Sequence, residues 1–76
     1  MDEKHCKILA LRDAIREELD ATNTYDHLID MMPEFRAVLT EIKQDEINHT
    51  GRLMNLLFTL APDEVEKFNK GMEQKE

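Results

Sequence analysis

The sequence of 76 residues has very few of the residues that interrupt helices or cross-link small folds. It contains two glycines, two prolines, one cysteine and no tryptophan. So few turn-forming residues leave long uninterrupted stretches, which excludes a sheet built from several hairpins and favours helix. A single cysteine excludes an intramolecular disulfide. A disulfide-stapled secreted scaffold is therefore ruled out, and we expect a reducing, cytoplasmic location.

Long apolar runs and clusters of basic residues are also missing. No stretch approaches the roughly 20 apolar residues that a membrane-spanning helix needs, so we expect no membrane partner. Seventeen acidic against ten basic side chains give a formal net charge of −7, with no Lys/Arg cluster to neutralise phosphates. This balance argues against a nucleic-acid partner and suits cationic partners such as metal ions.

Two apolar stripes separated by a proline predict an all-α, antiparallel helical hairpin. The stripes follow helical spacing through Ile8, Leu11, Ile15, Thr22, Tyr25, Ile29 and Met32, and then through Phe35, Leu39, Ile42, Leu53, Leu56 and Leu60. Pro33 suits a first helical turn but not a helix interior, so the chain turns there. We expect one domain over 1–76, with helices at about 5–31 and 33–60, a short helix at about 62–70 and a frayed tail.

A hairpin with a short third helix is too small to enclose a core of its own. Each long helix would span about 40 Å, and a chain this short seldom gains more than roughly 3 to 5 kcal/mol from its own core. Apolar stripes along both helices must be buried against a partner, and a twofold-related copy completes a ferritin-like four-helix bundle. We expect an obligate homodimer, or a larger ring built from dimers.

Three ionisable side chains fall within the apolar stripes: Glu18 in the first helix, and Glu46 and His49 in the second. Buried carboxylates are costly unless they are paired, hydrogen-bonded or bound to a metal. A turn between Met32 and Pro33 places residues side by side when their numbers sum to about 65, so Glu18 faces the space between Glu46 and His49. The three side chains are therefore expected to converge at one level of the hairpin.

The Glu-x-x-His spacing of Glu46 and His49 is weak evidence by itself, because roughly 0.4 such pairs are expected by chance in a chain of this composition. Its position is more informative. Two chains would supply four glutamates and two histidines, the ligand set of ferritin-like di-metal bundles. Four carboxylates balance two divalent cations, and oxygen and nitrogen ligands suit iron or manganese. The alternative is a buried Glu/His cluster that fixes the register of a non-catalytic dimer.

Three segments resemble the encapsulated ferritins, a two-helix branch of the ferritin and rubrerythrin superfamily: Arg16 to Asp26, the turn at Pro33 and Glu34, and Asp45 to His49. The similarity covers about residues 11–58. It implies a ferroxidase for iron storage or detoxification, with two ferrous ions per homodimer held by Glu18, Glu46 and His49 of both chains and oxidised by dioxygen. It also implies dimers assembled into an annular decamer.

The sequence departs from this family at two places. Thr24 precedes Tyr25 where the family commonly has a tryptophan. Nothing after Asn69 matches the tail that addresses these enzymes to an encapsulin shell, which is the candidate partner and compartment that the resemblance implies. A rubrerythrin-like peroxide reductase is the other enzymatic alternative, although the chain has no Cys-x-x-Cys pair to feed it electrons.

Three further residues are candidates for supporting roles. Tyr25 lies about 10 Å beyond Glu18 on the same helix face, within reach of the residues around the site, or serves as a core tyrosine with one solvated end. Glu17 and Asp20 match acidic positions near the site of the family. They are candidates for attracting ferrous ions, with ordinary surface charge as the alternative.

Overall fold

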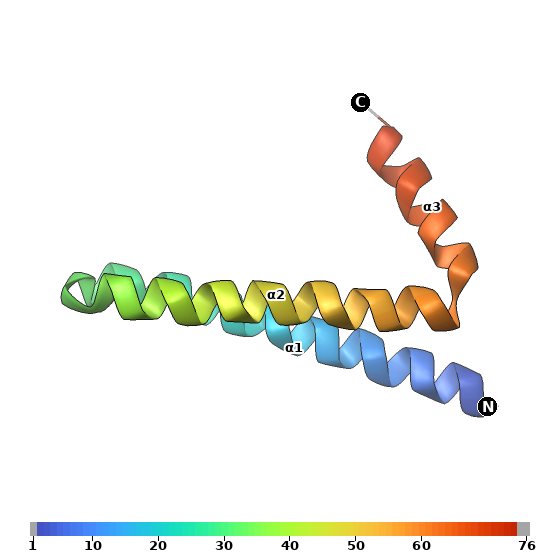
Figure 1. The fold of residues 1–76 in the computed structure, drawn as a ribbon, viewed down its shortest axis with the longest axis horizontal. Coiled ribbons are helices and arrows are strands. Elements are labelled where there is room, and N and C mark those ends of the chain that lie inside the picture. Colours follow the sequence, from blue (N-terminus) through green and yellow to red (C-terminus); the bar gives the residue numbers. More distant parts are fainter. Residues whose placement is uncertain (1, 75–76) are drawn as a thin grey trace.

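The computed structural model describes residues 2–74, and within them every regular element is a helix. The elements are α1 (Glu3–Met31), the 3-10 turn η1 (Pro33–Phe35), α2 (Arg36–Leu60) and α3 (Pro62–Glu73). Figure 1 shows α1 and α2 lying side by side and antiparallel, with α3 leaving the end of α2 at a steep angle. The all-α prediction is confirmed. None of the described helices is long and apolar enough for a membrane crossing.

Both breaks in the helical chain occur at the residue before a proline. Met32 and Ala61 each have φ −132°, with ψ 67° and 69°, outside the helical region. The proline ring clashes with the helical conformation of the preceding residue, so each break is a local consequence of the sequence. The backbone N–H of each residue still donates to the carbonyl four positions earlier, at 2.8 Å, which closes the preceding helix.

The first two helices begin at different residues from those predicted. α1 begins at Glu3 rather than at about residue 5, because the Asp2 side chain accepts a hydrogen bond of 2.7 Å from the backbone N–H of His5 and caps the helix. The segment expected to open the second helix at residue 33 forms η1 instead, and α2 itself begins at Arg36. The turn therefore uses one tight helical turn before the long helix.

The third helix is longer than predicted. α3 continues to Glu73 rather than to about residue 70, so the segment from Asn69 that we expected to fray is helical up to that point. Gly71 lies inside the helix with an ordinary negative φ and does not end it. The last part of the predicted frayed tail, residues 75–76, lies outside the described residues.

The seam between α1 and α2 holds a thin core. Among the described residues, Leu57, Ala61 and Thr50 are buried, and the predicted α1 stripe is half-buried along its length. The predicted α2 stripe is wrong at some positions: Leu56 is 53% exposed, as is much of Phe35. Thr50, Leu57 and Ala61 each lie one position beyond a predicted stripe residue, so the side of α2 that meets α1 is rotated from the predicted one.

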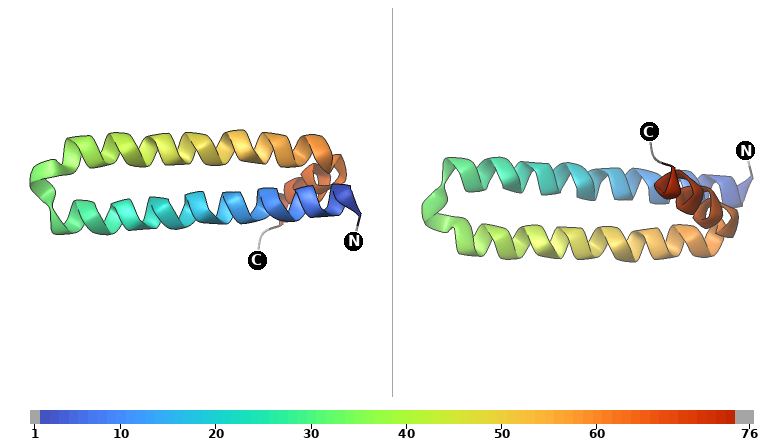
Figure 2. Two further views of the ribbon diagram at one scale, coloured as in Figure 1. Left: turned by 90° about the horizontal axis from the view of Figure 1, so that it is seen from below. Right: turned by 90° about the horizontal axis from the view of Figure 1, so that it is seen from above.

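One face of the hairpin is partly covered by α3, and the other is open. Arg12 of α1 forms an ion pair with Glu64 of α3, and the rings of Phe58 and Phe68 meet edge to face with centroids 5.4 Å apart. The two views of Figure 2 show α3 lying across one face of the hairpin, near the chain ends. Leu56 is two positions from Phe58 and points about 200° away around α2, so it lies on the open face.

The seam predicts a sharp difference between buried and outward leucines. Replacing Leu57, which is 4% exposed, with alanine should lower the free energy of unfolding by about 2 kcal/mol, because apolar burial is lost and a cavity remains. Leu19→Ala is the matched control, since Leu19 is 51% exposed and its truncation should cost less than about 0.5 kcal/mol. Urea unfolding followed by circular dichroism at one fixed protein concentration measures both. Equal losses would contradict the described seam.

Candidate metal centre

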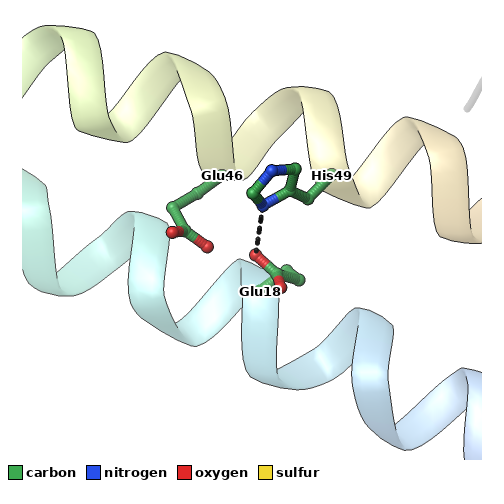
Figure 3. Close-up of side chains that lie close together, drawn as sticks. All are labelled: Glu18, Glu46 and His49. Atoms are coloured by element: carbon green, nitrogen blue, oxygen red, sulfur yellow. Dashed lines mark ion pairs between the residues drawn. The ribbon is translucent and has the colours of Figure 1, made fainter.

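The structure brings together Glu18, Glu46 and His49 midway along the hairpin. Glu18 comes from α1, and Glu46 and His49 come from adjacent turns of α2, so that all three side chains point into the same space (Figure 3). One ligand atom from each residue lies within 4.8 Å of the other two. The spacing of three on α2 puts its two side chains on one side of the helix, and the antiparallel register supplies the third.

The cluster is partly shielded from solvent. The Glu18 side chain is 26% exposed and that of His49 is 50% exposed, so the site opens toward His49. The Oε2 atom of Glu18 is buried and has no hydrogen-bond partner among the described residues. His49 Nδ1 lies 3.7 Å from this oxygen, which makes an ion pair when the imidazole is protonated but is too long for a hydrogen bond. A buried acceptor without a donor is costly, and a bound cation would remove that cost.

The two carboxyl groups influence each other's protonation. The pKa of Glu46 is raised, first because its protonated form can hydrogen-bond to Glu18, then because of partial burial and the negative charge of Glu18. The charge of His49 acts in the opposite direction. Without a cation, the arrangement favours a proton on Glu46. A metal ion that binds here therefore displaces that proton and takes over the neutralising role.

Two threonines stand one helical turn after the two glutamates. The Thr22 hydroxyl donates to the backbone carbonyl of Glu18 at 3.0 Å, and the Thr50 hydroxyl donates to that of Glu46 at 3.1 Å. The sequence analysis treated Thr22 as a stripe residue and missed Thr50. The signal that could have found both is the repeated Glu-x-x-x-Thr spacing on the two facing helices.

A surface pocket of about 300 Å³ opens directly onto the cluster. It is lined by Glu18, His49, Arg52, Leu53 and Leu56. The pocket lies on the open face of the hairpin, where Leu56 points. Arg52 was not among the sequence candidates, although it follows His49 by three positions and so shares its side of α2. In a single chain, the cluster thus has a protein wall on one side and an apolar-rimmed opening on the other.

The other predicted residues are not brought into the cluster. Tyr25 is half-buried on α1, and its hydroxyl makes no hydrogen bond with another described residue. Glu17 and Asp20 are exposed on α1, and their carboxylates form no ion pair within the described part of the chain. Their exposure leaves them free to attract cations from solvent, but the structure gives them no direct contact with the three central residues.

The donor set determines which ions fit. Two carboxylates and one imidazole offer oxygen and nitrogen ligands without thiolate, a set that suits iron and manganese. One chain offers three residues, which leaves coordination positions for solvent, for a reactant or for ligands from another chain. The unpartnered Glu18 oxygen and the close ligand atoms fit a divalent cation on geometric as well as chemical grounds.

Comparison with known proteins finds a partial similarity. The chain is 35% identical over 66 residues, 84% of its length, to a ferritin-like-encapsulin shell fusion protein of Pyrococcus furiosus. The match spans 19% of that protein, so the chain has about a fifth of the length of this relative. No protein-family model matches the chain, and no solved structure matches it. The similarity supports a relationship to encapsulin-associated, ferritin-like proteins.

The coupling of the two carboxyl groups gives a prediction for metal-free protein. Glu18→Gln removes the neighbouring charge and should lower the pKa of Glu46 toward its ordinary value, measured by NMR titration of the side-chain carboxyl carbon. Glu17→Gln, an exposed neighbour of the same type, should leave this pKa unchanged. An unaltered Glu46 titration in Glu18→Gln would contradict the described coupling.

The raised pKa also fixes how metal-free stability depends on pH. The folded chain binds the Glu46 proton more tightly than the unfolded chain, so this contribution to stability is present at low pH. It is lost as the pH rises from the unfolded pKa of Glu46 through its raised folded pKa.

Proposed function

We propose that the chain is a di-iron ferroxidase of the encapsulated ferritin family, which takes ferrous ions as substrate and oxidises them with dioxygen. The observation that carries the proposal is the convergence of Glu18, Glu46 and His49 around a buried carboxylate oxygen that has no partner of its own. The similarity to a ferritin-like-encapsulin shell fusion protein supports it independently of the geometry.

The proposal places the complete site between two copies of the chain. The apolar side chains Leu53 and Leu56 rim the opening beside Glu18 and His49, and Leu56 is 53% exposed in the single chain. A second groove of about 470 Å³ continues along the hairpin toward the chain ends, lined by Lys7, Ala10, Leu11, Leu56, Thr59 and Leu60. A twofold-related copy that covers this face would bury the exposed leucines and form a four-helix bundle.

Charge favours the same arrangement. One chain contributes two carboxylates, and two chains contribute four, which match the charge of two ferrous or other divalent ions such as manganese. Without metal, four carboxylates facing one another would repel, so the empty dimer must hold protons or admit water. Metal binding and assembly are therefore coupled in this proposal, because each copy completes the ligand set of the other.

Each residue has a distinct role in the proposed reaction. Glu18 and Glu46 bind and bridge the ions, while His49 contributes a nitrogen ligand and leaves positions open for dioxygen. Iron, when bound, supplies the one-electron chemistry: each ferrous ion loses one electron, and dioxygen accepts the electrons. Glu17 and Asp20 attract cations from solvent, and Tyr25 lies along the seam as a candidate electron donor close to the site.

An encapsulin-type shell is the partner that we propose outside the dimer. The relative joins, by its name, a ferritin-like part and an encapsulin shell in one protein. A hairpin dimer, or a ring of such dimers, has no enclosed cavity for storing ferric mineral. A surrounding shell would provide that space. Co-expression with an encapsulin shell protein followed by size-exclusion chromatography tests the association, and separate elution of the two proteins would argue against it.

The ferroxidase activity is tested with ferrous iron in air. The purified protein should develop ferric absorbance faster than buffer, and Glu18→Ala or His49→Ala should reduce the rate to that of buffer, because each removes a ligand from both halves of the site. Glu41→Ala, an exposed glutamate elsewhere on α2, is the matched control and should keep the wild-type rate. A wild-type rate no greater than that of buffer refutes the activity. A faster reaction with hydrogen peroxide than with oxygen would favour a peroxide reductase.

Assembly through the open face is tested by charge insertion. Leu56→Asp places a carboxylate at the rim of the opening and should convert the dimer into single chains by native mass, with loss of iron oxidation. The matched control is Leu19→Asp, which alters a residue with the same exposure, on the side of α1 turned away from Ala10 and the groove. That variant should stay dimeric. An intact Leu56→Asp dimer would place the interface elsewhere.

A further inference from the structure

Thr22 and Thr50 flank the two glutamates from opposite ends of the site. Thr22 follows Glu18 on α1, and Thr50 follows Glu46 on α2, each by one helical turn. Helical side chains lean back toward the preceding turn, so each threonine leans toward the turn that carries its glutamate. Because the helices are antiparallel, Thr22 lies on the η1 side of the cluster, and Thr50 lies on the side of the chain ends.

Packing alone does not explain hydroxyl groups at these positions. Thr50 is 8% exposed, the one buried polar side chain among the described residues, and Thr22 is half-buried. A hydroxyl bonded to the carbonyl four residues earlier slightly destabilises a helix, and that carbonyl already accepts the helical N–H. Valine has the same shape and would fill the seam without burying a hydroxyl. The two hydroxyls therefore need another reason.

The same local hydrogen bond occurs twice more in exposed positions. Thr24 donates to the Asp20 carbonyl at 3.2 Å, and Thr59 donates to the Asn55 carbonyl at 2.8 Å. There the hydroxyls remain in solvent, which satisfies them at no cost. These two threonines match Thr22 and Thr50 in residue type and local bonding and differ in their distance from the seam. They are internal controls for any effect of the bond itself.

We propose that Thr22 and Thr50 are positioning residues of the metal centre, whose hydroxyl oxygens hold water molecules bound to the ions. This inference rests on the proposed function. A hydroxyl that donates its hydrogen to a backbone carbonyl keeps lone pairs with which to accept another. Water bound to a divalent cation is a strong donor, and the carboxylates that could accept from it are occupied as metal ligands. The threonines supply acceptors that add no negative charge to a site already rich in carboxylates.

The hydrogen bonding of the cluster agrees with this role. Both hydroxyls donate to the backbone and not to a carboxylate, so the Glu18 Oε2 atom keeps its lone pairs for a cation. Direct ligands, Glu18, Glu46 and His49, and neutral acceptors, Thr22 and Thr50, thus form two separate groups. Hydrogen-bonding partners of metal-bound groups typically change metal affinity by about 10- to 100-fold when removed.

The test compares paired substitutions in the full chain, with Mn²⁺ as a redox-quiet probe. Thr22→Val with Thr50→Val removes both hydroxyls and keeps the shape, and Thr22→Ser with Thr50→Ser keeps both hydroxyls. Thr24→Val with Thr59→Val is the control. Calorimetry gives the Mn²⁺ affinity, the visible absorption of bound Co²⁺ reports the ligand environment, and thermal unfolding without metal reports the fold.

We expect the seam valine pair to bind Mn²⁺ about 10-fold more weakly and to shift the Co²⁺ spectrum, while metal-free unfolding is unchanged or occurs at higher temperature. The serine pair and the control pair should match the wild type. Wild-type affinity in the seam valine pair overturns the inference, as does a serine pair as weak as the valine pair. If the valine pair fails to fold, the serine pair decides. Wild-type protein that binds no metal refutes the proposed function itself, a result visible before any threonine is changed.

Discussion

Two antiparallel helices share a single seam, and a single seam cannot enclose a core. Within the described residues only Thr50, Leu57 and Ala61 are buried, while large apolar side chains such as Leu56 stay half-exposed. The thin core, the open face and the half-shielded Glu/His cluster all follow from this geometry. The short α3 covers part of one face and leaves the face with the candidate metal centre open, where a second copy can complete both the core and the site.

Polar groups in the seam determine how the chain balances stability and function. Leucines in place of Glu18 and Glu46 would strengthen the hairpin, and valine would pack as well as Thr50. Instead, two carboxyl groups share a confined space in which one of them favours a proton, and a carboxylate oxygen stands without a partner. A bound cation reverses each of these costs. The same residues that weaken the empty chain thus favour the loaded one, as linkage between binding and folding requires.

Much of this arrangement could be predicted from the sequence, because proline fixes the turn and the turn fixes the register. Pro33 placed Glu18 opposite Glu46 and His49, and the structure brings these three together. The α2 stripe was only partly right, because its apolar arc is wide enough to serve two contacts, and periodicity does not tell which part meets α1. Hence Leu57 was missed and Leu56 was placed in the seam. The role of Asp2 as a cap and the pocket contribution of Arg52 depend on contacts that spacing alone does not reveal.

Native mass spectrometry of the protein loaded with ferrous iron under anaerobic conditions tests the central claim most directly, because one spectrum counts both chains and ions. If Glu18, Glu46 and His49 of two copies share one site, iron should appear in assemblies with an even number of chains, at two ions per pair. Single chains should carry none. Iron bound equally well by single chains, or pairs that form without taking up iron, would contradict a metal centre completed by a second copy.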